Sequence, residues 1–213
     1  MKNCIVSFGN GAWYPRGVER LRESCEKFGV DLLSATEYYA WIPLHSVIPY
    51  GFKPALIARA FGLGYDNVLW IDSSGWLQHD PTPIFDIIEK EGYFILNNHG
   101  QFNNWWCNDA QLSHFGYTRE QARTQRHAVG GLVGFNRNCP YFKEYYDLQH
   151  LYKGQWNNDN RTESQSDECK GSRHDQSVLS LIVAKHELKL HDQKGFVTFA
   201  PEVLDGIVAM RGM

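Results

Sequence analysis

The stretch VLWIDSSGWL, Val68 to Leu77, decides the fold of this chain. Its unbroken run of Val, Leu, Trp and Ile predicts a strand buried on both faces, as in a parallel sheet covered by helices. Asp72 then stands at the carboxyl end of the strand, where open α/β sheets bind their ligands. A carboxylate here, close to the Ser74 hydroxyl, suits a hard divalent cation that carries phosphate. Asp72 could equally cap the turn after a core strand, and this stretch alone leaves both interpretations open.

The segments around this strand alternate between strand and helix patterns. Residues 4–8 and 30–34 have the pattern of strands, and residues 15–28 and 53–61 have that of helices with one apolar face. This order is typical of a parallel α/β sheet. Later strands are expected at 93–96 and 130–136, and later helices at 82–91, 118–126, 140–152 and 174–186. The predicted fold is therefore α/β, with a mixed, mostly parallel central sheet of about six strands flanked by helices.

Length and composition exclude several classes of protein. The 213 residues suit one domain over 1–213, which could be the N-terminal part of a longer chain. The 21 Lys and Arg against 24 Asp and Glu give a net charge of -3, so no basic excess points to nucleic acid or to a membrane surface. No apolar run is long enough for a membrane span. The polar stretch 154–173 is expected to be a mobile loop.

The cysteines indicate a reducing compartment. There are five, scattered along the chain without a C-x-x-C pair, which argues against a zinc ribbon or a disulfide framework. We therefore expect a cytoplasmic protein.

Three further features could contact a ligand, although each has an ordinary structural interpretation. The turn FGNG, Phe8 to Gly11, would let the backbone approach a nucleotide, but most such turns are only turns. The glycine-bearing strand GGLVGFN at 130–136 could flank a sugar or simply lie in the core. Asp175 and Gln176 open a helix, where they either cap it or offer a carboxylate and an amide to sugar hydroxyls.

The order of these motifs resembles that of the GT-A glycosyltransferases, which transfer a sugar from a nucleotide diphosphate. In that family a strand ends in a D-x-D motif that holds Mn²⁺ or Mg²⁺ against the diphosphate. The matching residues here are Asp72, Ser73 and Ser74, so a serine replaces the second acid and the expected metal affinity is lower. The chain is also similar to the N-terminal glycosyltransferase domain of a chlorovirus protein, which would place it in the host cytosol.

The resemblance implies a set of site residues. Asp72, Ser74 and a late histidine, His191, would bind the metal. The donor-binding residues would be Ser7, Phe8, Gly9, Asn10, Lys53, Arg59, Asp72, Ser73, Gly131, Asp175 and Gln176. Asp175 is the candidate catalytic base for an inverting reaction, with Asp109 and Asp192 as substitutes. A cation and a basic side chain at the diphosphate would stabilise the charge that develops on the leaving phosphate.

The resemblance therefore implies a metal-dependent hexosyl- or deoxyhexosyltransferase that moves a sugar from a UDP-sugar to a hydroxyl of a glycan acceptor. Two alternatives stay open. One is a sugar-phosphate nucleotidyltransferase, although FGNGAWYPRG is bulkier than the glycine-rich loop that those enzymes use. The other is a non-catalytic module that binds a nucleotide sugar or a glycan.

Overall fold

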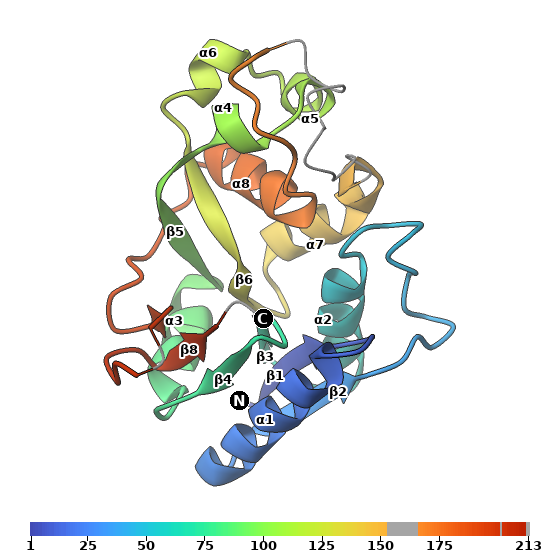
Figure 1. The fold of residues 1–213 in the computed structure, drawn as a ribbon, viewed down its shortest axis with the longest axis vertical. Coiled ribbons are helices and arrows are strands. Elements are labelled where there is room, and N and C mark those ends of the chain that lie inside the picture. Colours follow the sequence, from blue (N-terminus) through green and yellow to red (C-terminus); the bar gives the residue numbers. More distant parts are fainter. Residues whose placement is uncertain (153–165, 201, 212–213) are drawn as a thin grey trace.

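A computed structural model describes residues 1–152, 166–200 and 202–211. Its main sheet has five strands in the order β2-β1-β3-β6-β5 (Figure 1). These are β1 (Asn3–Phe8), β2 (Asp31–Ala35), β3 (Asn67–Ile71), β5 (Tyr93–Phe102) and β6 (Arg126–Asn136). β1 runs parallel to β2 and β3, whereas β6 runs antiparallel to β3 and β5. One strand, β6, thus opposes the other four.

The expectation of a mixed α/β sheet flanked by helices is confirmed. The sheet has five strands where about six were expected, and two of its four pairings are antiparallel. A second, three-stranded sheet has the order β4-β8-β7. It consists of β4 (Gly75–Leu77), β7 (Val197–Thr198) and β8 (Val208–Met210). The segment just after β3 therefore pairs with a strand near the end of the described residues.

Helices cover both faces of the main sheet, and its inner strands β1, β3 and β6 are buried over most of their length. Alternate residues point to opposite faces of a strand. Val68 and Trp70 of β3 therefore join the apolar cluster that includes α2 (Phe52–Gly62), α7 (Pro140–Asp147) and α8 (Asp175–Lys185). Leu69 and Ile71 join a second cluster with α1 (Tyr14–Phe28) and α3 (Thr82–Glu91). Strand β3 is therefore buried on both faces, as its apolar run predicted.

Strands β5 and β6 extend beyond the rest of the sheet. They have 10 and 11 residues, whereas β1 has 6. Their far end carries three short helices, α4 (Asn103–Trp106), α5 (Asp109–His114) and α6 (Arg119–Ala122), which Figure 1 shows above the two strands. Capping boxes begin α5 at Asn108 and α6 at Thr118, and these bonds hold such short helices in place.

Several boundaries differ from the prediction. The helix expected at 118–126 is shorter, because β6 begins at Arg126. The helix expected at 140–152 ends at Asp147 and continues as the 3-10 helix η1 (Leu148–Tyr152). Of the loop expected at 154–173, residues 154–165 lie outside the described residues. In its remaining part, the backbone N–H groups of Lys170 and Arg173 bond carbonyl groups of α4. Among the described helices, none has the length and apolar character needed to cross a membrane.

Candidate functional site

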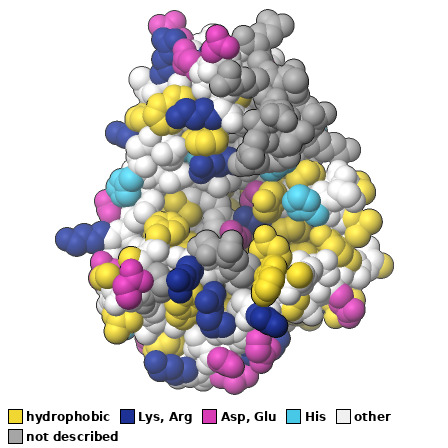
Figure 2. All heavy atoms as spheres, in the orientation of Figure 1, with side chains coloured by type: hydrophobic (Ala, Val, Ile, Leu, Met, Phe, Trp, Pro, Cys, Tyr) yellow, Lys and Arg dark blue, Asp and Glu magenta, His cyan; other side chains and the backbone are white. Residues whose placement is uncertain are grey.

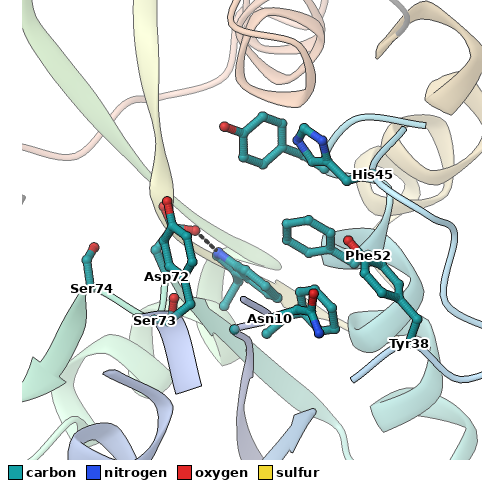
Figure 3. A pocket seen from close by; sticks show the side chains of 12 residues that line it. Asn10, Tyr38, His45, Phe52, Asp72, Ser73 and Ser74 are labelled. Carbon is teal, nitrogen blue, oxygen red and sulfur yellow. Dashed lines mark hydrogen bonds between the residues drawn. The ribbon is translucent and has the colours of Figure 1, made fainter. Parts of the chain in front are cut away.

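A cavity of about 500 Å³ lies at the carboxyl ends of β1 and β3 (Figure 3). Three groups of residues line it: the turn after β1, the segment between β2 and α2, and the turn after β3. Its lining residues are Phe8, Gly9, Asn10, Tyr14, Tyr38, His45, Tyr50, Phe52, Trp70, Asp72, Ser73 and Ser74. The cavity is therefore at the edge of the sheet where the sequence predicted a ligand.

One wall of the cavity is aromatic. The ring of Phe8 lies 5.0 Å from that of Tyr38 and 4.6 Å from that of Phe52, centre to centre. His45 and Tyr50 continue the wall, with ring centres 4.9 Å apart. Flat, amphipathic rings of this kind suit a planar, partly polar ligand.

Asp72 stands at the other end of the cavity and is held by fixed partners. The indole Nε1 of Trp70 donates to Asp72 Oδ1 at 2.6 Å. A Cβ at position 131 would lie 2.6 Å from Met210 Cε and 3.0 Å from Asp72 Oδ2, so Gly131 leaves space for the carboxylate. The side chain of Asp72 remains 36% exposed, which leaves it accessible from the cavity.

Lys53 links Asp72 to Asp175. Its Nζ lies 3.2 Å from Asp72 Oδ1 and 3.2 Å from Asp175 Oδ2, and it donates to the Gly130 carbonyl at 2.9 Å. Its side chain is only 4% exposed. Burial alone would lower the pKa of Lys53, but the two carboxylates reverse this effect and raise the pKa above its usual value. Lys53 is therefore a buried ammonium ion.

Asp175 is buried and does not line the cavity. Burial raises the pKa of its carboxyl group, while Lys53 opposes that shift. Tyr145 Oη donates to Asp175 Oδ2 at 3.0 Å. Helix α8 has His174 as its N-cap residue and no side-chain capping bond. In this structure Asp175 therefore neutralises Lys53, a role that the sequence interpretation did not consider.

Cationic side chains meet at the rim of the cavity beside Ser74. Arg20 Nη2 donates to the Ser74 carbonyl at 2.9 Å, and the backbone N–H of Arg211 approaches the same oxygen at 3.3 Å. The Arg20 guanidinium lies 3.7 Å from the centre of the Trp76 ring. Burial, and next the charge of Arg211, lower the pKa of Arg20, so the two cations are close enough to interact. An anion between them would relieve that repulsion.

A second hollow of about 470 Å³ adjoins this rim. It is lined by Trp13, Tyr14, Arg16, Gly17 and Arg20, and it shares Tyr14 with the first cavity. A Cβ at position 17 would lie 1.9 Å from the Ser73 carbonyl oxygen, so glycine lets α1 approach the turn after β3. Figure 2 shows several dark-blue side chains below the central hollow of this face, in the region of α1 and β4.

The structure brings most of the predicted site residues together, but not all of them. Phe8, Gly9, Asn10, Asp72, Ser73 and Ser74 line the cavity, and Lys53 and Gly131 contact Asp72. Ser7 is fully buried and outside the lining. Arg59 lies over the Trp41 ring at 5.9 Å, away from the cavity lining. Gln176 Nε2 donates to the Ala128 carbonyl at 2.7 Å.

The remaining acids and the predicted metal histidine lie elsewhere. His191 bridges to the outer side of β5, so β6 and β5 separate it from β3, and its Nε2 lies 3.3 Å from Glu91 Oε2. Asp109 pairs with Arg119, and Asp192 lies 3.5 Å from His99. Within the described ranges, no group of three or more His, Cys, Asp or Glu side chains could hold a metal on its own.

Sequence reasoning missed the arginines of the rim and the tyrosines of the wall. Arg16 and Arg20 follow the FGNG turn at a spacing of four, which places them on one side of a helix, so their pattern was present in the sequence. Arg211 had no local signal, because only the pairing of β8 with β4 brings it to Ser74.

The fold is similar to that of a known glycosyltransferase. No family model matches the chain, and no curated protein matches its sequence. Among solved structures, it is similar to the crystal structure of a glycosyltransferase involved in the glycosylation of the major capsid of PBCV-1, a chlorovirus. The two have a TM-score of 0.60 at 13% sequence identity, over 99% of this chain and 94% of the other. This likeness is one of fold.

Proposed function

We propose that this protein is a GT-A-type glycosyltransferase that transfers a sugar, a hexose or deoxyhexose, from a UDP-sugar to a hydroxyl group of a glycan. The observation that carries the proposal is the cavity at the carboxyl ends of β1 and β3, which runs from an aromatic wall to Asp72 and the arginine rim. Its volume of about 500 Å³ lies within the range of small-molecule sites. The likeness of the fold agrees with the proposal.

The two ends of the cavity match the two ends of a nucleotide. The base would lie against Phe8, Tyr38 and Phe52, where flat rings are available for stacking. The diphosphate would then lie near Ser74, where Arg20 and Arg211 offer positive charge. Guanidinium groups bind phosphate oxygens with strong, directional hydrogen bonds.

The residues beside Asp72 fit a divalent cation that arrives with the donor. Asp72 Oδ1 is occupied by Trp70 and Lys53, which leaves Oδ2 as the available oxygen. Mg²⁺ is often held by one or two carboxylates together with substrate phosphates, so one protein carboxylate is sufficient. We therefore propose that Asp72 holds Mn²⁺ or Mg²⁺, with Ser74 on the same turn as a second oxygen donor. The cation would stabilise negative charge on the leaving phosphate.

Asp175 contacts the proposed metal site only through Lys53. The role of Asp175 as a base stays a prediction, and its contacts favour a different role. It lies 3.2 Å from Lys53 Nζ, which in turn lies 3.2 Å from Asp72 Oδ1. Asp175 thus positions the ammonium group that fixes the orientation of Asp72.

The five cysteines are buried free thiols. Because free thiols are typical of a reducing compartment, we propose that the enzyme is cytoplasmic.

The test is release of UDP from a panel of UDP-sugars with Mn²⁺ and a mixed glycan acceptor. Asp72→Asn keeps the size of the side chain and removes its charge, so we expect UDP release to fall by about 100-fold or more, as when one electrostatic contact to the transition state is lost. Asp80→Asn is the matched control, because Asp80 is exposed and only accepts hydrogen bonds from Thr82, the first residue of α3. Binding of UDP without turnover would instead indicate a non-catalytic module, and full activity of Asp72→Asn would contradict the assigned site.

A further inference from the structure

Three cationic side chains lie on aromatic rings at the far end of β5 and β6. Lys170 Nζ is 3.9 Å from the centre of the Trp105 ring, and the Arg173 guanidinium is 3.8 Å from that of Trp106. The Arg126 guanidinium is 4.7 Å from the centre of the Phe102 ring. We call Arg126, Lys170 and Arg173 the cationic patch. Figure 2 shows dark-blue side chains set among yellow ones in the region of α4, above the central hollow.

Unlike the neighbouring arginines, the cations of the patch have no carboxylate partner among the described residues. Arg119 forms an ion pair with Asp109, and Arg123 forms one with Glu168. No carboxylate of the described residues lies within ion-pair distance of Arg126, Lys170 or Arg173. The patch therefore presents three charges that the described part of the protein leaves uncompensated.

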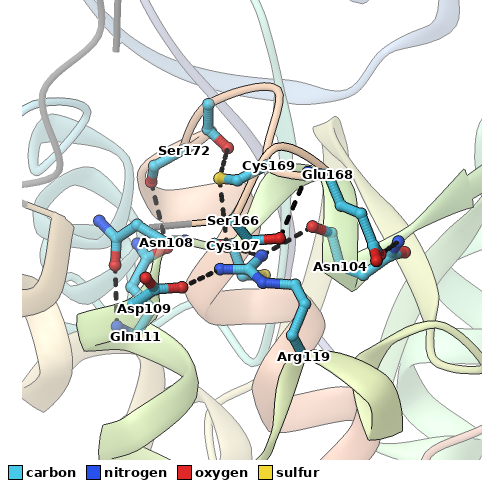
Figure 4. Close-up of polar contacts among 11 residues, drawn as sticks. Asn104, Cys107, Asn108, Asp109, Gln111, Arg119, Ser166, Glu168, Cys169 and Ser172 are labelled. Carbon is cyan, nitrogen blue, oxygen red and sulfur yellow. Dashed lines mark hydrogen bonds and ion pairs between the residues drawn. The ribbon is translucent and has the colours of Figure 1, made fainter. Parts of the chain in front are cut away.

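The backbone that carries the patch is fixed by polar contacts. The N–H of Lys170 donates to the Trp105 carbonyl at 2.7 Å, and that of Arg173 donates to Ser177 Oγ at 2.8 Å. Asn104 Nδ2 donates to Glu168 Oε2 at 2.9 Å, and Ser172 Oγ to Gln111 Oε1 at 3.1 Å (Figure 4). A ligand that binds here has little ordering cost to overcome in the protein.

The patch and the proposed donor site both adjoin strand β6. Arg126 begins β6, and the same strand passes Gly131 beside Asp72 five residues later. At about 3.3 Å per residue, these two positions are roughly 16 Å apart along the strand. Arg173 is two residues before Asp175 in the chain. A chain of a few sugar units could therefore reach from the patch to the reacting centre.

From these observations we infer that the cationic patch binds the acceptor, and that the acceptor is an anionic glycan, one that bears carboxylate or phosphate groups. This inference rests on the proposed function, since it names the second substrate of that reaction. Cations seated on aromatic rings keep their charge and lose rotational freedom, which favours a fixed anionic ligand. Single-stranded nucleic acid is the competing ligand of such surfaces. The net charge of -3 for the whole chain argues against it.

The experiment measures binding of trigalacturonate by calorimetry, with maltotriose as the neutral trimer and oligothymidylate as the nucleic acid. Arg126→Gln with Lys170→Gln removes two exposed charges that do not adjoin Asp175. We expect this double variant to bind trigalacturonate at least about tenfold more weakly than the parent. The matched control, Lys143→Gln with Lys185→Gln, removes two charges that already pair with Asp147 and Glu144, and it should bind as the parent does.

The outcomes separate the two proposals. Loss of trigalacturonate binding with unchanged UDP binding and unchanged melting temperature supports the patch as an acceptor site. No binding of trigalacturonate by the parent, equal binding of maltotriose, an unaffected double variant or tighter binding of oligothymidylate would each overturn it. Failure of the parent to bind UDP would contradict the donor site alone, because trigalacturonate is measured without UDP.

Discussion

Lys53 determines the geometry of the candidate site at the scale of single residues. It is a buried ammonium ion between two carboxylates, and its contact with the Gly130 carbonyl fixes it to β6. Burying a charge is costly unless it is paired and hydrogen-bonded. Asp72 and Asp175 supply that pairing. The orientation of Asp72 therefore depends on a residue that no ligand needs to touch.

Asp175→Asn tests this dependence through stability. The substitution leaves Lys53 with one carboxylate in a buried site, so we expect the free energy of unfolding to fall by on the order of 3 kcal/mol. Urea denaturation measures it. Asp192→Asn is the control: Asp192 is exposed and lies 3.5 Å from His99, so its loss should change stability by less than about 0.5 kcal/mol. Equal midpoints for Asp175→Asn and the parent would show that Lys53 does not need this partner.

The sequence predicted the position of the site better than the roles of its residues. The position of Asp72 followed from an apolar run that ends in an acid, and the structure places it at the predicted edge of the sheet. The role of Asp175 did not follow, because one sequence cannot show that Lys53 lies beside it. His191 was assigned by order in the chain alone, and its ring instead stacks on Phe94, with the centres 5.3 Å apart.

At the scale of elements, the start of α8 is strained. His174 has φ 51° and ψ -114°, a backbone conformation that residues other than glycine rarely adopt. Its side chain is buried, and Nδ1 lies 2.9 Å from the Tyr152 carbonyl. This conformation lies just where the chain passes from the cationic patch to Asp175. The strained residue thus lies between the cationic patch and the carboxylate that pairs with Lys53.

The same residue gives the protein a predicted sensitivity to acid. Burial lowers the pKa of His174 from 6.5 to about 4. Between these values the unfolded chain binds a proton that the folded protein does not, so stability is lost as pH falls from 6.5 to 4. The loss from this group is at most about 3 kcal/mol.

The variant His174→Asn, which tolerates a positive φ and does not titrate, should show a flatter decline of urea stability over this interval. His114→Asn, at an exposed position, is the control and should follow the parent. A decline in His174→Asn as steep as that of the parent would assign the acid sensitivity to other groups, such as the buried His127.

Periodicity predicted the elements but not the directions of the strands. The helix at 15–28 ends at Gly29, whose φ of 66° explains why glycine stands there. By contrast, the apolar pattern of a buried strand does not depend on the direction of the strand in the sheet. The sequence therefore could not show that β6 is antiparallel to its neighbours. Its direction depends on the excursion through α4, α5 and α6, which returns the chain from the far end of β5.

At the scale of the whole molecule, the candidate donor site combines distant parts of the chain. Ser74 follows β3, Arg20 lies on α1, and Arg211 follows β8 from the last described residues. The pairing of β8 with β4 holds this arrangement together. Such long-range contacts are not encoded in any local pattern, which is why the sequence predicted the location of the site and missed the cations at its rim.

The contribution of this arrangement can be measured as stabilisation of the whole fold by UDP. A ligand that binds only the folded protein, at 100 times its Kd, adds about 2.7 kcal/mol, which for a chain of this size raises the Tm by roughly 5–10 °C. Arg20→Gln removes the guanidinium proposed to face the diphosphate. If its UDP affinity falls about tenfold, the added stability at the same UDP concentration drops to about 1.4 kcal/mol and the Tm shift to about half.

Arg22→Gln is the matched control for this last prediction. Arg22 lies on the same helix, where its guanidinium bonds Glu19 and Ser34, so its loss should leave the UDP-induced shift intact. Each variant is compared with itself without UDP, because Arg20 also packs on Trp76 and its removal lowers the Tm of the free protein. If UDP raises the Tm of Arg20→Gln as much as it raises that of Arg22→Gln and the parent, the diphosphate does not lie at Ser74.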